Sequence, residues 1–303
     1  MFKFACVSAV RCLAWPNELD AMNLEFIRDC LRDRELTDAT VKCFIEEKLK
    51  AEAQRCDPEK DTKYLAVFRY AIETFYPQAV ENIYKYSGSK IETMFLNSVL
   101  LSFLYDDPLG LIIWEPCPNM PEAIREQRER LRLMLKRDNE IKAKLDGKGG
   151  IVEYMEYLLQ EKLIEEESYV RYKNEFIVMH VLDYYHAFIL VMQAGFPEIK
   201  INGKSVRTDL FIYVPANDEF NLVVECDGFE YHSGKDSFIS DRQRDRALKA
   251  NGFDVVRFSG SEIYKDPARA GIELYGYLQR LRLKRFPEMG EVSLHAEGHA
   301  IDR

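Results

Sequence analysis

The sequence predicts an α/β fold, in which a mixed four-stranded sheet flanked by helices follows a helical N-terminal region. Two observations lead to this prediction. Before about residue 186, apolar residues recur at three- and four-residue spacing, which is the period of amphipathic helices. After it, four short segments are rich in β-branched and aromatic residues and are separated by turn residues, which is typical of strands. The chain has 303 residues, 47% of them hydrophobic, which is enough for a core and for two domains or one domain with a large insertion.

The first 86 residues are expected to form helices that carry no chemical motif. Periodic segments cover 23–34, 37–55 and 64–76. The last of them is expected to end before Pro77, because proline cannot donate the next helical hydrogen bond. We expect this region to serve packing or contact with a protein partner.

The N-terminal residues 1–15 are apolar enough to imitate a signal peptide, but Arg11 interrupts them and no small-x-small cleavage site follows cleanly. A buried first element is therefore expected. No stretch reaches the roughly 18 uninterrupted apolar residues of a membrane span. The seven cysteines include no Cys-x-x-Cys pair, so we interpret them as reduced thiols of a cytoplasmic protein.

The middle of the chain is also expected to be helical. A Ser-Gly-Ser segment at 87–89 precedes an apolar helix at 91–105, and a proline-rich link then leads to a charged helix at 122–145. A further helical stretch is expected at 151–184.

The four strands are expected in the C-terminal third, and a helix full of Asp and Arg at 236–250 connects the last two of them. A final helix follows at 267–286. The strands are expected at 187–193, 206–214, 220–227 and 253–258.

These elements suggest a division of the chain into three parts. Residues 1–86 form the helical N-terminal region, and residues 87–286 form the main domain. Within that domain, residues 116–184 are interpreted as a helical insertion and residues 187–286 as the sheet-bearing core. The polar residues 287–303 are expected to form a flexible tail.

The second and third predicted strands carry three acids on one face. Side chains alternate between the faces of a strand, so Asp209 lies opposite the apolar face of its own strand, and Glu225 and Asp227 share a face of the next. A hairpin symmetric about Asn217 pairs residue 209 with residue 225, with Cβ atoms about 4.5–5.5 Å apart. The spacing therefore predicts one cluster of carboxylates.

Three carboxylates at this spacing repel one another, and they need bound protons or a cation to coexist. Oxygen ligands suit Mg²⁺ or Mn²⁺ rather than zinc. Such an ion leaves room for a phosphate and serves phosphodiester hydrolysis. Taken alone, each acid is more often an ordinary solvent-facing residue of a hairpin, and it is the shared face that favours a site.

Four segments in this order resemble the PD-(D/E)XK nuclease superfamily, and most closely its very-short-patch-repair-like (Vsr-like) branch, in which Glu-x-Asp-Gly is followed by a nearby His. The resemblance implies a restriction-endonuclease-like fold and metal-dependent endonuclease activity on DNA, with RNA as the alternative substrate. The segments are Arg-Thr-Asp at 207–209, the run at 224–232, Asp-Arg-Gln-Arg-Asp at 241–245, and the run at 252–258.

The resemblance also implies roles for individual residues. Asp209 would be the first metal ligand and Glu225 the second, assisted by the main-chain carbonyl of Cys226. Asp227, also counted among the ligands, stands where the superfamily more commonly has lysine. The water-activating group is therefore open, and His232 is a candidate for proton transfer or for holding a phosphate. The alternative for His232 is a hydrogen bond within a loop.

The superfamily places a further acid on the helix that precedes the first core strand. Glu92 is the favoured candidate, and Glu175 is the alternative. A purely structural role for Glu92 is to close a capping box with Ser89. Gln193 resembles a glutamine often found at the end of the first strand.

Several basic residues are candidates for contact with nucleic acid, although charged runs of this kind are more often solvated helix faces. Arg242 and Arg257 belong to the nuclease-like segments, and Lys235 lies between two of them. Other candidates are Arg125, Arg128, Arg132 and Lys136 in the charged helix, and Arg280, Arg282, Lys284 and Arg285 near the C-terminus.

The net charge of −9 weighs against a non-specific nucleic-acid coat protein, whose affinity depends on excess Lys and Arg. It does not exclude a nuclease, because a metal site itself requires carboxylates. The rival interpretation is a catalytically inactive nuclease fold that serves as a scaffold or as a nucleic-acid or protein-binding module. The sequence leaves the oligomeric state open.

Overall fold

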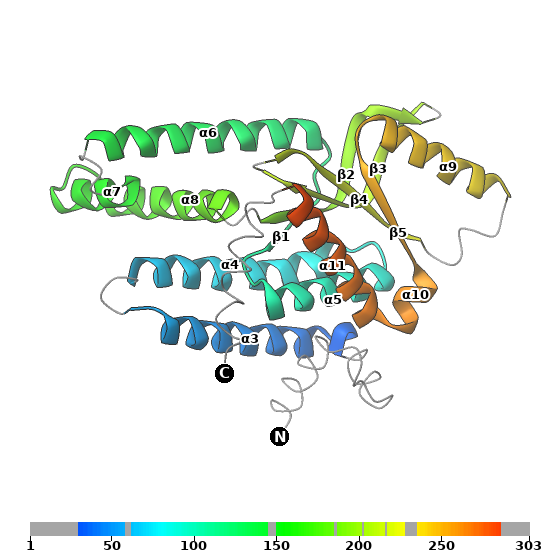
Figure 1. Cartoon of the computed structure of the whole chain (residues 1–303), viewed down its shortest axis with the longest axis horizontal. Coiled ribbons are helices and arrows are strands. Elements are labelled where there is room, and N and C mark those ends of the chain that lie inside the picture. Colours follow the sequence, from blue (N-terminus) through cyan, green and yellow to red (C-terminus); the bar gives the residue numbers. More distant parts are fainter. Residues whose placement is uncertain are drawn as a thin grey trace, which may run out of the picture.

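The computed structural model describes residues 30–57, 62–144, 150–184, 187–201, 203–215, 217–227 and 235–285 (Figure 1). The expectations for residues 1–29 and for the tail at 287–303 lie outside the described residues, as does His232.

A mixed five-stranded sheet lies at the centre of the fold, in the order β1-β2-β3-β4-β5. The two outer pairs are parallel and the two inner pairs are antiparallel. The mixed sheet was predicted, but the number of four strands was wrong. The strands are β1 (Leu111–Trp114), β2 (Phe188–Ile201), β3 (Lys204–Val214), β4 (Asn217–Asp227) and β5 (Asp254–Ser259).

The additional strand, β1, lies in the segment that the sequence had presented as an irregular link between helices. It is a four-residue apolar run, Leu-Ile-Ile-Trp, and periodicity cannot classify a run this short. It becomes a strand because it pairs in parallel with β2, with Leu111 opposite Phe188. This pairing joins residues far apart in the sequence, so no local signal indicates it.

The β3–β4 hairpin has the predicted register over most of its length. Leu210 pairs with Val224 and Tyr213 with Asn221, which is the symmetry about residue 217 expected from the sequence. Near the turn the register shifts, and Val214 pairs with Asn217. As a result, β4 begins three residues earlier than predicted and the connection between the strands is shorter.

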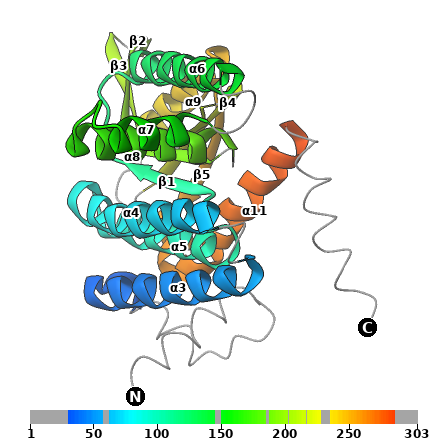
Figure 2. The same cartoon turned by 90° about the vertical axis from the view of Figure 1, so that its left-hand side faces the viewer.

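Helices cover both faces of the sheet, as the 90° view shows most clearly (Figure 2). Helices α5 and α11 pack against each other below the sheet, and α4 runs beside β1. Helix α9 covers the other face, and α3 forms an outer layer against α4 and α5. These helices are α3 (Arg34–Arg55), α4 (Thr62–Tyr86), α5 (Lys90–Asp106), α9 (Lys235–Ala250), α10 (Gly260–Lys265) and α11 (Pro267–Arg285).

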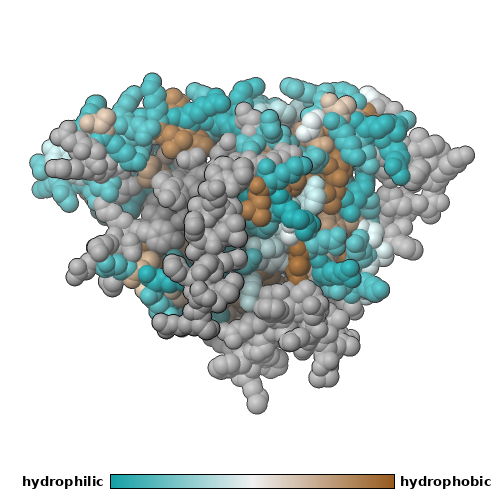
Figure 3. All heavy atoms as spheres, viewed as in Figure 1, coloured by the Kyte–Doolittle hydropathy of each residue, from teal (hydrophilic) through white to brown (hydrophobic). Residues whose placement is uncertain are grey.

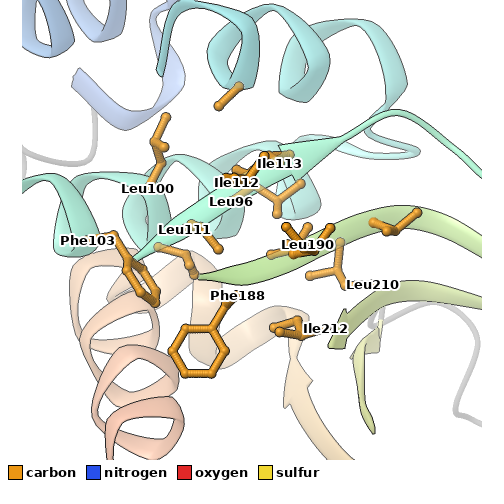
Figure 4. Packing of buried hydrophobic residues seen from close by; sticks show 14 of the residues in the cluster. Leu96, Leu100, Phe103, Leu111, Ile112, Ile113, Phe188, Leu190, Leu210 and Ile212 are labelled. Carbon is orange, nitrogen blue, oxygen red and sulfur yellow. The ribbon is translucent and has the colours of Figure 1, made fainter. Parts of the chain in front are cut away.

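The main core forms between the sheet and α5 with α11. Phe103 of α5 lies 5.9 Å from Phe188 of β2, measured between ring centroids, and Leu190 and Ile212 lie beside them (Figure 4). All four side chains are buried, and each contributes about 1.5–3 kcal/mol by leaving water. On the face shown in Figure 3, the described residues are mostly hydrophilic, with apolar residues in small groups between them.

Helix α4 continues through Pro77, so the prediction that it ends there was wrong. Proline in a helix costs about 3 kcal/mol, because one hydrogen bond is lost and the ring crowds the preceding turn. Pro77 itself is exposed, while Tyr76, Val80 and Ile83 are buried on the inner face. Burial of this face on both sides of the proline offsets that cost.

Three helices between β1 and β2 extend to one side of the sheet (Figure 1). They share a small core of their own around Ile141, Ile151 and Met155. The stretch expected as one helix at 151–184 is two, because residues 161–165 form a turn in which Lys162 has a φ of +56°. The helices are α6 (Met120–Lys144), α7 (Ile151–Gln160) and α8 (Glu166–Tyr184). They occupy the expected insertion, whose boundaries stay a prediction.

Among the described residues, no helix combines the length and the apolar character needed to cross a membrane. The five cysteines within the described ranges form no disulfide with one another.

Candidate active site

A row of polar side chains crosses the sheet at the level where β3 and β4 carry their acids. The register of β2 with β3 places Gln193 opposite Asp209. The register of β3 with β4, continued by one residue, places Asp209 opposite Glu225, as the sequence predicted. Glu225 in turn pairs with Arg257 of β5. Four neighbouring strands therefore each place one polar residue at the same level.

Asp209 is held by the neighbouring strand. The backbone N–H of Cys226 donates to Asp209 Oδ2 over 2.9 Å. Burial raises the pKa of the Asp209 carboxyl, while this hydrogen bond and the charge of Arg244 lower it, and the charge of Asp227 raises it again. Asp227 is thus close enough to Asp209 to raise the pKa of its carboxyl.

Glu225 is the most buried of the three acids on these strands, with 5% of its surface exposed. Burial raises the pKa of its carboxyl to about 8, although the neighbouring Arg244 lowers the pKa and Asp209 raises it. The Nη2 atom of Arg244 lies 2.8 Å from Glu225 Oε1. The same Nη2 atom donates to the carbonyl of Arg207, so one guanidinium links α9 to β3 and β4.

Arg244 also has an unused donor. Its Nε atom is buried and has no hydrogen-bond partner within the described part of the chain. A buried donor without an acceptor costs free energy, and a group that supplies an oxygen would remove this cost.

Glu92 comes from α5, far away in the sequence, and lies beside the row. Its carboxylate accepts hydrogen bonds from the backbone of Gly88 at 2.9 Å, from Gln193 Nε2 at 3.2 Å and from Ser89 Oγ at 3.3 Å. Burial raises the pKa of Glu92, and the charge of Asp209 adds to this rise.

Glu92 combines the two roles that the sequence presented as alternatives. Ser89 caps α5 by accepting from the Glu92 N–H at 3.2 Å, and the Glu92 side chain returns to the same turn. It simultaneously lies within electrostatic range of Asp209. Glu175, the other candidate, is exposed on α8. The fold thus brings Glu92 to the acids, and Glu175 has no described contact with them.

Gln193 has an unusual backbone for a residue within a strand, because its φ is +51°. A side chain in this left-handed region costs about 1–2 kcal/mol relative to the ordinary extended conformation. The amide of Gln193 donates to Glu92 Oε2, so the strained residue connects β2 to the start of α5. Backbone strain of this kind is often found at functional sites.

Asp227 and Arg257 form the outer part of the cluster. Arg257 Nη1 lies 2.8 Å from Asp227 Oδ1, and its Nη2 lies 2.7 Å from Asp245 Oδ1 on α9. Arg257 was expected to contact nucleic acid. Its guanidinium is instead held between two carboxylates.

Within the described residues, no group of three or more His, Cys, Asp or Glu side chains has an arrangement that could hold a metal ion. Each of the three strand acids has a partner within the chain, since Arg244 contacts Glu225, Arg257 contacts Asp227 and the Cys226 N–H donates to Asp209. The donor set itself suits a hard cation, since it consists of oxygens. Burial raises the pKa of Asp209, Glu225 and Glu92, and a bound cation would offset the cost of burying these carboxylates in their charged form. The oxygen donors of these residues therefore fit a divalent metal ion in their chemistry.

The other predicted residues are more scattered. His232 lies outside the described residues, and so does the side chain of Lys235. Arg242 is exposed on α9. Arg128 donates to the carbonyls of Pro215 and Asn217, so it ties α6 to the β3–β4 turn.

Three basic residues expected at phosphates have other surroundings. Arg125 and Arg132 are exposed on α6 beside glutamates of the same helix. Arg282 is buried, lies 2.6 Å from Asp107 and stacks on the ring of Phe188. Arg282 therefore serves the packing of α11.

The sequence interpretation did not assign a role to Arg244. It included Arg244 only as part of the segment 241–245. A signal was available, because Arg244 lies four residues before Leu248, which is fully buried, so both are on the inner face of α9.

Comparison with known proteins agrees with this geometry. Residues 191–278 match the family model REase_MTES_1575, a restriction-endonuclease-like family. The match supports a PD-(D/E)XK-type nuclease, and it does not single out the Vsr-like branch. It includes Asp209, Glu225 and Arg244 but begins well after Glu92. No curated protein and no solved structure gave a significant match to the chain.

Proposed function

We propose that the protein is a metal-dependent endonuclease that hydrolyses phosphodiester bonds of DNA. Asp209, Glu225 and the carbonyl of Cys226 would hold Mg²⁺ or Mn²⁺, with Asp227 and Glu92 completing the acidic site. The observation that carries the proposal is the placement of the buried Glu225 and the half-buried Asp209 on adjacent strands, at positions that the strand register puts opposite each other, inside the region that matches a restriction-endonuclease-like family.

A bound divalent ion supplies Lewis-acid stabilisation and a nucleophilic water at neutral pH, and restriction-endonuclease-like families usually use such ions. The residues of this chain do the remaining work. Asp209 and Glu225 present carboxylate oxygens, and Gln193 orients Glu92 through its amide. Glu92, with its raised pKa, is suited to accept a proton from the attacking water, as His232 also is.

The common lysine of the superfamily is absent, since Asp227 stands at its position. Arg244 is a cation close to Glu225, since its Nη2 atom lies 2.8 Å from Glu225 Oε1. If Glu225 held a metal ion, the guanidinium of Arg244 would be available to donate to a phosphate oxygen. Its unpartnered Nε supports this role. The Vsr-like branch is our finer assignment, based on Glu225, Asp227, Gly228 and His232.

The proposal is tested by incubating plasmid and single-stranded DNA, and RNA in parallel, with the full chain and Mg²⁺ or Mn²⁺. Glu225→Gln and Asp209→Asn are expected to reduce cleavage by about 100-fold or more, since each removes a metal ligand. Glu219→Gln, an exposed acid on the same strand β4, is the matched control and is expected to keep full activity.

The choice between the two helix acids is tested with a second pair of variants. Glu92→Gln is expected to reduce cleavage strongly, and Glu175→Gln is expected to leave it unchanged. Equal activity of folded Glu225→Gln and wild type would overturn the assignment of the metal site.

The second candidate function is an inactive nuclease fold that serves as a scaffold. The observation that favours it is the engagement of Glu225 and Asp227 by internal arginines, which satisfies the acids without a metal. Absence of cleavage by the wild type, together with absence of metal binding by calorimetry, would favour this function over the nuclease.

A further inference from the structure

A pocket of about 560 Å³ lies beside the start of α5, on the opposite side of that helix from Glu92. Its walls come from four separate parts of the chain: the residue Arg32 just before α3, the end of α4, the first turns of α5, and α10. We call it the Arg32–Tyr264 pocket. The described residues that line it are Arg32, Tyr84, Lys90, Ile91, Thr93, Met94 and Tyr264.

The composition of this lining is unusual for an acidic protein. None of the described lining residues carries a carboxylate, although the chain as a whole has a net charge of −9. The lining instead contains two cations, two tyrosines and the apolar residues Ile91 and Met94. Such a lining favours a ligand that carries both negative charge and a flat apolar surface.

Tyr264 and Arg32 contact each other in the lining of the pocket. The guanidinium of Arg32 lies 4.9 Å from the ring centroid of Tyr264, and its Nε donates to the sulfur of Met94 at 3.4 Å. These contacts keep the guanidinium plane close to the ring. Tyr264 nevertheless keeps 53% of its surface exposed, so part of the ring is accessible to a ligand. Lys90 is exposed at the first position of α5.

The pocket adjoins the candidate active site on two elements. Lys90 and Glu92 belong to the same first turn of α5, two residues apart and therefore on nearly opposite sides of the helix. Tyr264 follows Ser259, which pairs with Asp227 at the end of β5. The pocket is thus about one helix diameter, ~10 Å, from Glu92. At this spacing, a strand that lay at the acids would need only a few nucleotides to reach the pocket.

We propose that the Arg32–Tyr264 pocket binds an unpaired nucleotide of the nucleic-acid substrate. Its base would stack on Tyr264, and its phosphate would pair with Arg32 and Lys90. Aromatic side chains combined with cations are the usual means of binding single strands, whereas bases inside a duplex are stacked on each other and do not offer a free face. The inference rests on the proposed nuclease function and deepens it. It specifies that the substrate contains an unpaired nucleotide next to the bond that is cut.

Fluorescence anisotropy of labelled oligonucleotides tests this proposal. The full chain is titrated in EDTA, so that no cleavage occurs, against a short single strand, a blunt duplex, and the same duplex with an unpaired overhang. Tyr264→Ala is expected to weaken binding of the single strand and the overhang by about tenfold, the effect of losing one stacked base. Binding of the blunt duplex is expected to change by less than about twofold.

Three further variants separate stacking from charge and from misfolding. Tyr264→Phe keeps the ring and is expected to bind like the wild type. Lys90→Ala is expected to weaken single-strand binding and its salt dependence, because one phosphate contact is lost. Tyr157→Ala is the matched control, since Tyr157 on α7 is also 53% exposed but lies outside the pocket.

The outcomes distinguish the pocket from the nuclease. The nucleotide-binding role of the pocket would be overturned by either of two results. Tyr264→Ala could bind single strands as tightly as the wild type, or it could lose the same amount of affinity for the duplex as for the single strand. The nuclease proposal would then depend only on whether the wild type cleaves nucleic acid in Mg²⁺ and whether Glu225→Gln reduces this cleavage. If single-strand binding depends on Tyr264 but the protein cuts no nucleic acid, the proposed nucleotide-binding pocket is supported and the proposed nuclease function is wrong.

Discussion

At Glu225, burial and an ion pair act on the same carboxyl in opposite directions. Burial disfavours the charged form, whereas Arg244 favours it, and burial dominates. The cost of burying this acid persists even though it has an arginine partner at 2.8 Å. A position that is expensive for stability in this way is typical of a site kept for function.

This imbalance predicts how stability depends on pH. The pKa of Glu225 is about 8 in the folded protein, above its usual value of 4.5. Between these values the folded protein holds a proton that the unfolded chain has released, so folding stability is expected to fall as pH rises through this window. Glu225→Gln cannot titrate, and its stability is expected to fall less over the same range. Urea denaturation of both proteins at about pH 6 and about pH 8 measures the difference in slope. Parallel slopes would show that Glu225 is charged in the folded state.

At the scale of single elements, β2 contains the clearest conflict between local preference and tertiary structure. A strand favours extended backbone, yet Gln193 in its middle has a φ of +51°. The hydrogen bond from its amide to Glu92 and the pairing on both sides of it with β3 hold this conformation.

The strain at Gln193 predicts opposite effects for two substitutions. Gln193→Val is expected to destabilise the fold by about 2–3 kcal/mol, because a β-branched residue is disfavoured at this φ and the hydrogen bond is lost. Gln193→Gly loses the same hydrogen bond but removes the strain, so its stability is expected to stay within about 1 kcal/mol of the wild type. Denaturant midpoints of the two variants provide the test. A glycine variant less stable than the valine variant would contradict the left-handed backbone.

At the scale of the whole molecule, long-range polar contacts tie separate layers together. Arg128 connects the helical insertion to the β3–β4 turn through two backbone carbonyls. Arg282 of α11 pairs with Asp107, just after α5, and packs on Phe188 of β2. These contacts join elements that local sequence patterns cannot relate to each other.

The contact of Arg282 gives a prediction for global stability. Arg282→Met is expected to destabilise the protein by about 2–3 kcal/mol, because Asp107 loses its partner and the stacking on Phe188 is altered. Arg280→Met is the matched control, since Arg280 is exposed on the same helix, and it is expected to change stability by less than about 0.5 kcal/mol. Thermal unfolding compares the two. Equal losses would show that the Arg282 ion pair does not hold α11 in place.

The sequence by itself determined the features that depend on neighbouring residues. Strand alternation placed Asp209 on one face of β3, and Glu225 with Asp227 on one face of β4. The symmetry of a short hairpin then set the pairing of Asp209 with Glu225. Helix periodicity likewise indicated α5 and α9. These are local properties, because a strand repeats every two residues and a helix every 3.6.

Only the tertiary structure decided what depends on contacts between distant segments. It made β1 a strand by pairing it with β2, and it carried α4 through Pro77 by burying both halves of its inner face. It also brought Glu92 to Gln193 and turned Arg244 toward Glu225. The physical reason is that burial and long-range pairing outweigh local preferences of about 1–3 kcal/mol, and no periodic pattern in the sequence records which distant segments meet.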